Sequence, residues 1–315
     1  MIALPLQMRY IPTIAATAAF SAVFTCSVFA DTFSVADEDD YWGRWSDKYY
    51  TNHTRLAYTL GGDNGEEGAY FFTFGQEMYS PKDHVAPAAP PNDHPYAGFI
   101  YVSAGRSLWE DNIMFSTELQ VGAVGRASMA HGIQRDFHHL IGEETLNGWD
   151  SQVPNQPGIN LLGEVRTRFV LAGEMESGWG SDLICRGFAE LGTVRTMLSA
   201  GAQLRFGYNL PKNFGYTPMR QSTAVAIQSK VDSIYAFWDF EGDAMIYDVT
   251  LGGELLRHFD TDIQPYPFAF QSSIGIEIIY GHWTLTIYQS FRTKDFSEAD
   301  HTFSAWGGVK ISFSF

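Results

Sequence analysis

The last seven residues of the chain place the tightest constraint on its fold. From Val309 to Phe315 the odd-numbered residues are Val, Ile, Phe and Phe, and the even-numbered ones are Lys, Ser and Ser. A period of two residues predicts a β-strand with one apolar and one polar face. Alternation up to a terminal Phe is typical of an outer-membrane barrel strand, with lipid outside and a polar lumen inside. A strand of a soluble sandwich also alternates, so this stretch alone leaves both folds open.

The first thirty residues favour the membrane interpretation. They carry one charge, Arg9, followed by an apolar run from Ile11 to Phe29 and the small residue Ala30. A charged start, an apolar centre and a small-residue cleavage site predict a secretory signal peptide over residues 1–30. We therefore expect one domain over residues 31–315, located in the bacterial outer membrane. No later apolar run reaches the roughly 18–20 residues of a transmembrane helix.

Composition excludes two classes of protein. Without Arg9 the chain carries 19 Lys and Arg against 36 Asp and Glu, a formal net charge of −17. Such a surface offers no basic footprint, so we expect no nucleic acid partner. One cysteine, Cys185, remains after the signal peptide. The fold therefore cannot depend on an intramolecular disulfide.

Alternating stretches recur along the chain. Ile274, Ile276, Ile278 and Tyr280 form one stripe, and Gly281 makes a tight turn into the next strand. Twelve candidate strands result: Phe33–Asp40, Arg55–Leu60, Tyr70–Glu77, Tyr96–Ser107, Ile113–Val124, Asn160–Leu171, Leu183–Val194, Ser199–Asn209, Ser233–Tyr247, Gln271–Tyr280, His282–Arg292 and Phe303–Phe315. An even number allows the sheet to close with antiparallel ends and no exposed edge. The predicted fold is all-β: a transmembrane antiparallel barrel of twelve strands.

The connections between these strands alternate in length. The long ones are Tyr79–Pro95, Gly125–Gly158, Pro211–Val231 and Leu251–Phe268. Long loops of such barrels lie outside and short turns lie on the periplasmic side. We expect these four to be external loops with short helical turns. The spacing from Ala127 to Ile141 predicts one or two helical turns, a lid or plug at the barrel mouth.

The longest loop contains the candidate base. The polar stretch Ile133 to Gln152 holds the adjacent pair His138 and His139, with Glu143 and Glu144 a few residues further on. A histidine near a carboxylate can act as a general base on water or on a hydroxyl. Two adjacent histidines cannot both point into one site. The pattern itself does not choose between them.

A run of four acids, Asp37 to Asp40, is the candidate cation site. Neighbouring carboxylates repel one another unless a cation or hydrogen bonds compensate. Carboxylate oxygens at this density suit a hard cation, with Ca²⁺ the natural candidate outside the cytoplasm. A solvated acidic loop is the alternative. Zinc motifs and the GxSxG elbow are absent from the sequence, so neither a zinc site of that kind nor an α/β-hydrolase is expected.

Motifs in order along the chain resemble the lipid A 3′-O-deacylase family of outer-membrane β-barrel enzymes. The matching segments are Glu38–Gly43, Ser46–Asn52, Gly75-Gln76, Tyr79–Pro81, Asn92–Tyr101, Gly122–Gly125, Gln134, His138, Ile141-Gly142, Gly148–Asp150, Gln152, Asn155–Leu161 and Arg292–Phe296. Two positions depart from the family pattern. Asp39 stands where the family has Asn, and His94 stands where it has Arg.

The resemblance implies a function and a set of residues. Family members hydrolyse the ester that holds the 3′ acyloxyacyl chain of lipid A, with Ca²⁺. By motif, His138 is the general base, Thr51 orients water or substrate, and Glu144 holds the imidazole or shapes the loop. Asp39 and Asp40 are further catalytic positions, and with Glu38 they are the candidate Ca²⁺ ligands. The expected partners are lipid A, or lipopolysaccharide, and outer-membrane lipid, with the barrel a monomer.

Two other functions stay open. The first is an outer-membrane phospholipase with a Ser nucleophile and His138. The second is a catalytically impaired barrel that serves as a channel or adhesin.

Overall fold

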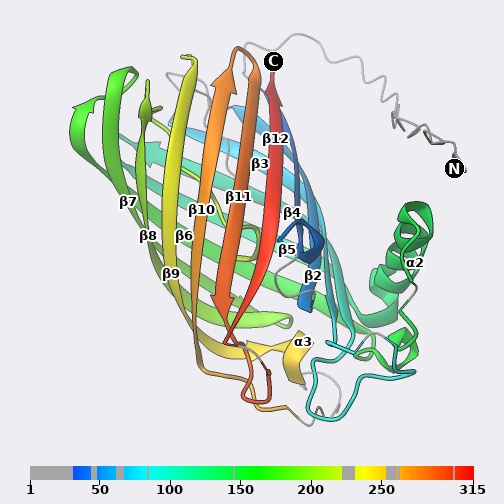
Figure 1. Ribbon diagram of the computed structural model, residues 1–315. Helices are drawn as coiled ribbons and strands as arrows, with labels where there is room; N and C mark the ends of the chain where they lie inside the picture. The colour runs from blue at the N-terminus through cyan, green and yellow to red at the C-terminus, as the bar shows by residue number, and fades with distance from the viewer. Residues whose placement is uncertain are drawn as a thin grey trace, which may run out of the picture.

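Twelve antiparallel strands close into a single barrel (Figure 1). The computed structural model describes residues 31–43, 48–61, 67–83, 85–144, 146–221, 231–252, 261, 263–300 and 302–315. The predicted signal peptide, residues 1–30, lies outside this part. The strands are β1 (Thr32–Asp39), β2 (Tyr49–Gly61), β3 (Gly68–Ser80), β4 (Ala97–Glu110), β5 (Ile113–Val124), β6 (Gln156–Glu174), β7 (Ser177–Gly192), β8 (Arg195–Tyr208), β9 (Ser233–Asp248), β10 (Phe268–Tyr280), β11 (Trp283–Thr293) and β12 (Phe303–Ser314). The predicted fold and strand number are confirmed.

The first and last strands close the sheet. β1 pairs with β2 on one side and with β12 on the other, in a register that places Thr32 opposite Ser314 and Asp39 opposite Gly307. Closure pairs the edge groups of the sheet, which a membrane would otherwise leave without hydrogen bonds. Both ends of the domain therefore lie at one end of the barrel. We call it the periplasmic end because short turns gather there, and the opposite end the external end.

The wall is apolar outside and polar inside. In β10 the side chains of Ile274 and Ile276 are 54% and 51% exposed, whereas that of Glu277 is 7% exposed and turned to the lumen. This reverses the pattern of a soluble sandwich and is what a membrane-spanning strand requires. In the described part of the chain no helix is long and apolar enough to cross a membrane.

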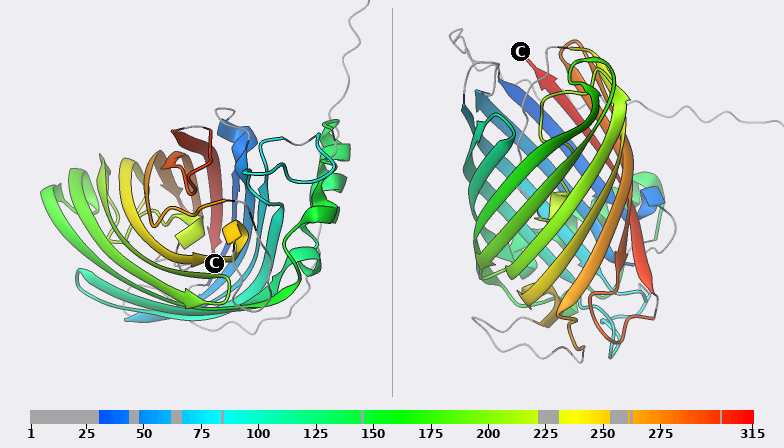
Figure 2. Two further views of the ribbon diagram at one scale, coloured as in Figure 1. Left: turned by 90° about the horizontal axis from the view of Figure 1, so that it is seen from below. Right: turned by 90° about the vertical axis from the view of Figure 1, so that its left-hand side faces the viewer.

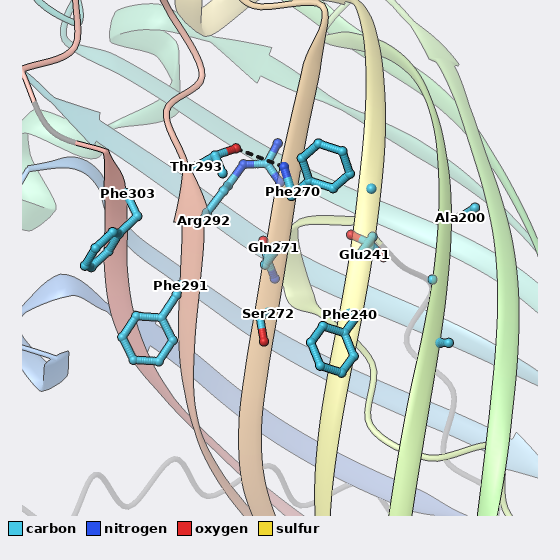
Figure 3. Close-up of a pocket in the computed structure, with 13 residues that line it drawn as sticks. Ala200, Phe240, Glu241, Phe270, Gln271, Ser272, Phe291, Arg292, Thr293 and Phe303 are labelled. Atoms are coloured by element: carbon cyan, nitrogen blue, oxygen red, sulfur yellow. Dashed lines mark hydrogen bonds between the residues drawn. The ribbon is translucent and has the colours of Figure 1, made fainter.

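The outer wall also has an apolar hollow of about 710 Å³ across strands β8 to β12. Phenylalanines from four of these strands line it: Phe240, Phe270, Phe291 and Phe303 (Figure 3). Phe270 is held by a hydrogen bond from its backbone N–H to Oγ1 of Thr293, 2.9 Å away. Aromatic lining of this kind suits contact with hydrocarbon, so the hollow belongs to the apolar outer surface of the wall.

The lumen is filled with buried ion pairs. Arg186 bonds to Asp239 and Glu241, and Arg195 bonds to Glu77 and Asp248. Charges buried in this way are tolerated because each has a partner and further hydrogen bonds. The interior is thus a polar core rather than an empty tube in the described part of the chain.

The connection Pro211–Val231 was predicted to be an external loop, and this is wrong. Asn209 donates its backbone N–H to the carbonyl of Gly178 at the start of β7, so this connection leaves β8 at the periplasmic end. From there the described residues up to 221 run inside the barrel. Arg166 donates to the carbonyls of Phe214 and Tyr216, at 2.8 and 3.2 Å. Buried guanidiniums need acceptors, and this inner segment, residues 209–221, supplies them from its backbone.

Short helices lie in four connections. They are α1 (Asp40–Gly43), η1 (Gly125–Ser128), α2 (Ala130–Ile141), η2 (Trp149–Ser151), η3 (Met219–Gln221) and α3 (Val249–Gly252). The predicted helix over Ala127–Ile141 exists, but α2 is longer than one or two turns. It also stands beside the barrel wall, on its outside, and does not cover the mouth as a lid or plug would (Figures 1 and 2).

Candidate active site on the outer wall of the barrel

The period of β1 divides the acidic run between the two sides of the wall. Glu38 points into the lumen, where it accepts hydrogen bonds from the hydroxyls of Tyr50 and Tyr288, at 2.6 and 2.7 Å. Asp37 and Asp39 point outward because side chains alternate along a strand. The structure therefore places Glu38 on the lumen side of the wall and Asp39 on the outer side.

Asn52 holds the outward carboxylates. It lies opposite Asp39 in the β1–β2 pairing. Its Nδ2 is 3.2 Å from Oδ2 of Asp39 and 3.0 Å from Oδ1 of Asp37. The other Asp39 oxygen accepts the backbone N–H of Tyr41 at 2.7 Å. Asp40, the next residue, begins α1 and is buried. Asp39 is thus fixed on the outside of the wall with both oxygens engaged.

A β-bulge in β2 places Thr51 beside Asn52 and Asp39. The side chains of Tyr50 and His53 both contact lumenal groups, yet only two residues separate them. The β2–β3 register shifts between Tyr50 and Asn52 to accommodate the extra residue. Bulges of this kind redirect side chains and are common beside active sites. Here Thr51 reaches the hydroxyl of Ser80 at 2.6 Å.

The external loop between β5 and β6 fastens α2 to the wall. Gly98 of β4 leaves room for it, since a Cβ there would lie 2.2 Å from Oγ of Ser128 and 2.5 Å from Cβ of Ala130. On the loop side, Nε1 of Trp149 donates to Oε1 of Gln134 at 2.6 Å. This ring also stacks on His131, at a centroid distance of 6.0 Å. The motif residues Gly148-Trp149-Asp150 therefore support the helix.

His138 lies in the last turn of α2 and makes one defined hydrogen bond. Its Nδ1 is 2.6 Å from the backbone carbonyl oxygen of Glu144. A carbonyl can only accept, so Nδ1 carries the proton and, in the neutral ring, Nε2 carries the lone pair. Gly142 ends the helix with a φ of +78° and turns the chain back toward His138. Glu144 thus holds the imidazole through its backbone.

Helices α1 and α2, which carry the two halves of the site, both lie on the outer side of the wall over neighbouring strands. α1 contacts β12 and β2, and α2 contacts β4 and β3. The Asp39 carboxyl lies within electrostatic range of the His138 side chain. Thr51 lies next to Asn52, which bonds to Asp39. His139 is exposed on α2. Of the predicted residues, the structure groups His138, Asp39 and Thr51 on one side of the wall, with Glu38 on the other.

The donor atoms near β1 suit a hard cation. Asp39 and Asp40 offer carboxylate oxygens and Thr51 offers a hydroxyl, the ligand types that Ca²⁺ accepts. Within the described ranges, no three His, Cys, Asp or Glu side chains are grouped as a metal centre. Further ligands would have to be carbonyls, water or substrate oxygens.

Two residues near the site, Asn52 and Ser80, stand out from the sequence only as parts of motifs. Their side chains hold Asp39 and Thr51. His94, the other departure from the family pattern, is buried and stacks on Tyr79, with ring centroids 5.5 Å apart. Burial lowers the pKa of this imidazole. His94 is therefore a buried packing residue.

A family model described as outer membrane protein LpxR matches residues 6–315. The chain belongs to the LpxR family. The predicted resemblance to the lipid A 3′-O-deacylases is confirmed, and the protein is an outer-membrane barrel. LpxR membership supports an outer-membrane lipid A deacylase.

One similar solved structure shares the fold. LpxR from Salmonella typhimurium superimposes with a TM-score of 0.79 at 18% identity, over 90% of this chain and 100% of that chain. The β domain of the Bordetella autotransporter BrkA reaches a TM-score of 0.42 at 11% identity, covering 91% and 98% of the two chains. No curated protein sequence matches the chain.

Proposed function

We propose that this protein hydrolyses the ester that holds the 3′ acyloxyacyl chain of lipid A, with His138 as the general base. The observation that carries the proposal is the hydrogen bond from Nδ1 of His138 to the carbonyl of Glu144. It orients the ring and leaves Nε2 as the basic nitrogen. A histidine positioned in this way is suited to take a proton from water.

The reaction then follows from ordinary ester chemistry. Nε2 of His138 takes a proton from water while the water oxygen bonds to the ester carbonyl carbon. The carbonyl electrons move to the oxygen and form a tetrahedral oxyanion. When the oxyanion collapses, the bond to the sugar oxygen breaks and the imidazolium returns its proton to that oxygen. The products are a free acyloxyacyl acid and a hydroxyl on lipid A.

We propose that Asp39 and Asp40 would hold Ca²⁺, with Thr51 orienting the water or the substrate. The donor chemistry of these residues supports this ligand set, and we leave Glu38 out because it faces the lumen. Bound Ca²⁺ would supply positive charge that stabilises the oxyanion. Asn52 keeps the Asp39 carboxylate in place.

The remaining partners follow from the surface. Lipid A is the proposed substrate. Outer-membrane lipid is proposed to surround the apolar wall. The net charge of −16 offers no basic surface for nucleic acid. A closed barrel has no free sheet edge, so we propose that it acts as a monomer.

Mass spectrometry of lipid A from cells that express the protein tests the proposal. Wild-type expression should remove one acyloxyacyl unit, and His138→Ala should leave lipid A intact. His139→Ala, one residue away and exposed, is the matched control and should behave as wild type. Labelling by a serine-directed phosphonate would point instead to the phospholipase with a Ser nucleophile. Intact lipid A with the folded wild-type protein overturns the deacylase.

A further inference from the structure

Helix α2 exposes an apolar side that no part of the described chain covers. Met129, which precedes the helix, and Ile133, Phe137 and Leu140 within it are 58%, 45%, 51% and 66% exposed. Their spacing of four, four and three residues places them along one side of a helix. Large apolar side chains in such a row are an interaction surface rather than scattered surface residues.

The other sides of α2 are accounted for. Ala130 and Gln134 are buried, the first against the gap left by Gly98 and the second in its bond to Trp149. Arg135 and Asp136 form an exposed ion pair at 2.8 Å. The helix therefore has a packed side, a polar side and an open apolar side. An amphipathic helix of this type is suited to lie at a membrane surface, with its apolar side among the acyl chains.

The position of α2 identifies what covers the apolar side. The helix stands outside the wall and beside it, at the height of the strands rather than beyond their ends (Figures 1 and 2). It contacts β3 and β4. On β4 and β5, Val102, Leu119 and Val121 are 59%, 49% and 47% exposed and belong to the lipid-facing wall. The apolar side of α2 continues this surface.

We propose that α2 is inserted into the outer leaflet, with Met129, Ile133, Phe137 and Leu140 in contact with lipid acyl chains. The consequence for the reaction rests on the proposed function. His138 lies in the last turn of the same helix, so the base is held beside the acyl chains and outside the barrel mouth. An ester buried just below the headgroups then reaches Nε2 sideways, without leaving the bilayer.

Spin labels measure the insertion directly, whatever the activity of the protein. In a Cys185→Ala background, a nitroxide is attached to Ile133→Cys or Phe137→Cys, and the protein is reconstituted into phosphatidylethanolamine and phosphatidylglycerol vesicles. Collision with oxygen reports lipid, and collision with a water-soluble nickel chelate reports water. Both labels should show several-fold higher oxygen-to-nickel ratios than the matched control Arg135→Cys, close to the ratio of Val102→Cys on the wall. Ratios at Ile133 and Phe137 equal to that at Arg135 overturn the proposal.

A negative charge on the apolar side of α2 tests whether the ester reaches His138 through the bilayer. Phe137→Asp should lower lipid A deacylation in cells several-fold, because a carboxylate in the acyl region withdraws the helix. His139→Asp adds the same charge on the polar side and should not change it. Equal activity of the two variants overturns lateral access through α2. Failure of the wild-type protein to deacylate lipid A would remove the proposed function but leave the label ratios as a test of insertion.

Discussion

The Nδ1 atom of His138 lies 2.6 Å from the backbone carbonyl oxygen of Glu144. The two residues are joined by the turn at Gly142, so the last turn of α2 and the chain that follows act as one unit. The acceptor is a main-chain atom, which selects one tautomer of the ring without adding a charge beside it.

Removal of the imidazole should remove the general base. For purified protein with lipid A in mixed micelles, we expect His138→Ala to lower the rate by roughly 10²- to 10⁴-fold, the usual contribution of such a group. His139→Ala should stay close to wild type because that ring points away. Mass spectrometry of the released acid gives both rates. A His138→Ala rate near wild type would mean that another group takes the proton.

The close approach of η1 and α2 to the wall makes Gly98 essential for the site but not for the barrel. Gly98→Ala should displace the start of α2, because its new Cβ would meet Ser128 and Ala130 at 2.2 and 2.5 Å. Deacylation should fall at least tenfold. Gly163→Ala on β6 is the matched control, since nothing lies within 4 Å of its Cβ position. Both variants should keep the mobility shift on heating that reports a folded barrel. Equal activity of the two variants would contradict this account of the helix.

Deacylation should depend on Ca²⁺ held by residues of β1 and β2. Excess EGTA should abolish deacylation, and full activity in EGTA would count against a metal role. Asn52→Ala removes the amide that bonds to Asp39 and Asp37. It should raise the Ca²⁺ concentration needed for half-maximal activity several-fold. Terbium luminescence titration gives the affinity without turnover. An unchanged terbium affinity would mean that Asn52 does not position a ligand.

The inner segment should block the lumen. In planar bilayers the wild-type protein should show no steady channel steps. Arg166→Ala with Arg205→Ala removes bonds to the backbone of residues 211–216 and should produce brief openings. Arg106→Ala, which lies on the outer wall over the ring of Tyr70, should remain silent. Porin-like conductance of the wild type would revive the channel alternative.

Acid should loosen the external end of the barrel through Asp295. Burial alone would raise the pKa of this carboxyl, but the guanidiniums of Arg292 and Arg220 outweigh it and lower the pKa. A lowered pKa means that the ionised group stabilises the fold above the unfolded value of about 3.9 and that this stability is lost as pH falls. Asp295→Asn should therefore unfold at a lower temperature than wild type at pH 7, and the gap should narrow below pH 4. A gap that does not change with pH would exclude this linkage.

Much of the wall could be predicted from the sequence because each strand carries its own period of two. All twelve strands were placed in the correct order, and the alternation of Val309 to Phe315 lies in β12. The same period of two separates Glu38 from Asp39 and places these two expected Ca²⁺ ligands on opposite sides of the wall.

The position of the inner segment and the bulge at Thr51 could not be predicted from the sequence. Loop length does not say at which end a connection lies, and Pro211–Val231 has the length of an external loop. What draws it inward is a set of arginines on other strands, Arg166, Arg168 and Arg205. The bulge at Thr51 depends on Tyr50 and His53 both finding lumenal partners. Such requirements arise only when distant strands meet.

The seam of the barrel and the inner segment both join parts of the chain that are far apart in sequence. β1 bonds to β12, so the sheet cannot close until the final strand is available. The inner segment belongs to the connection between β8 and β9, and its backbone meets Arg55 of β2, Arg166 of β6 and Arg195 of β8. The segment is therefore bonded to strands from both halves of the chain, and its contacts are complete only when those strands have come together. The inner segment thus fastens distant parts of the wall to one another from inside the barrel.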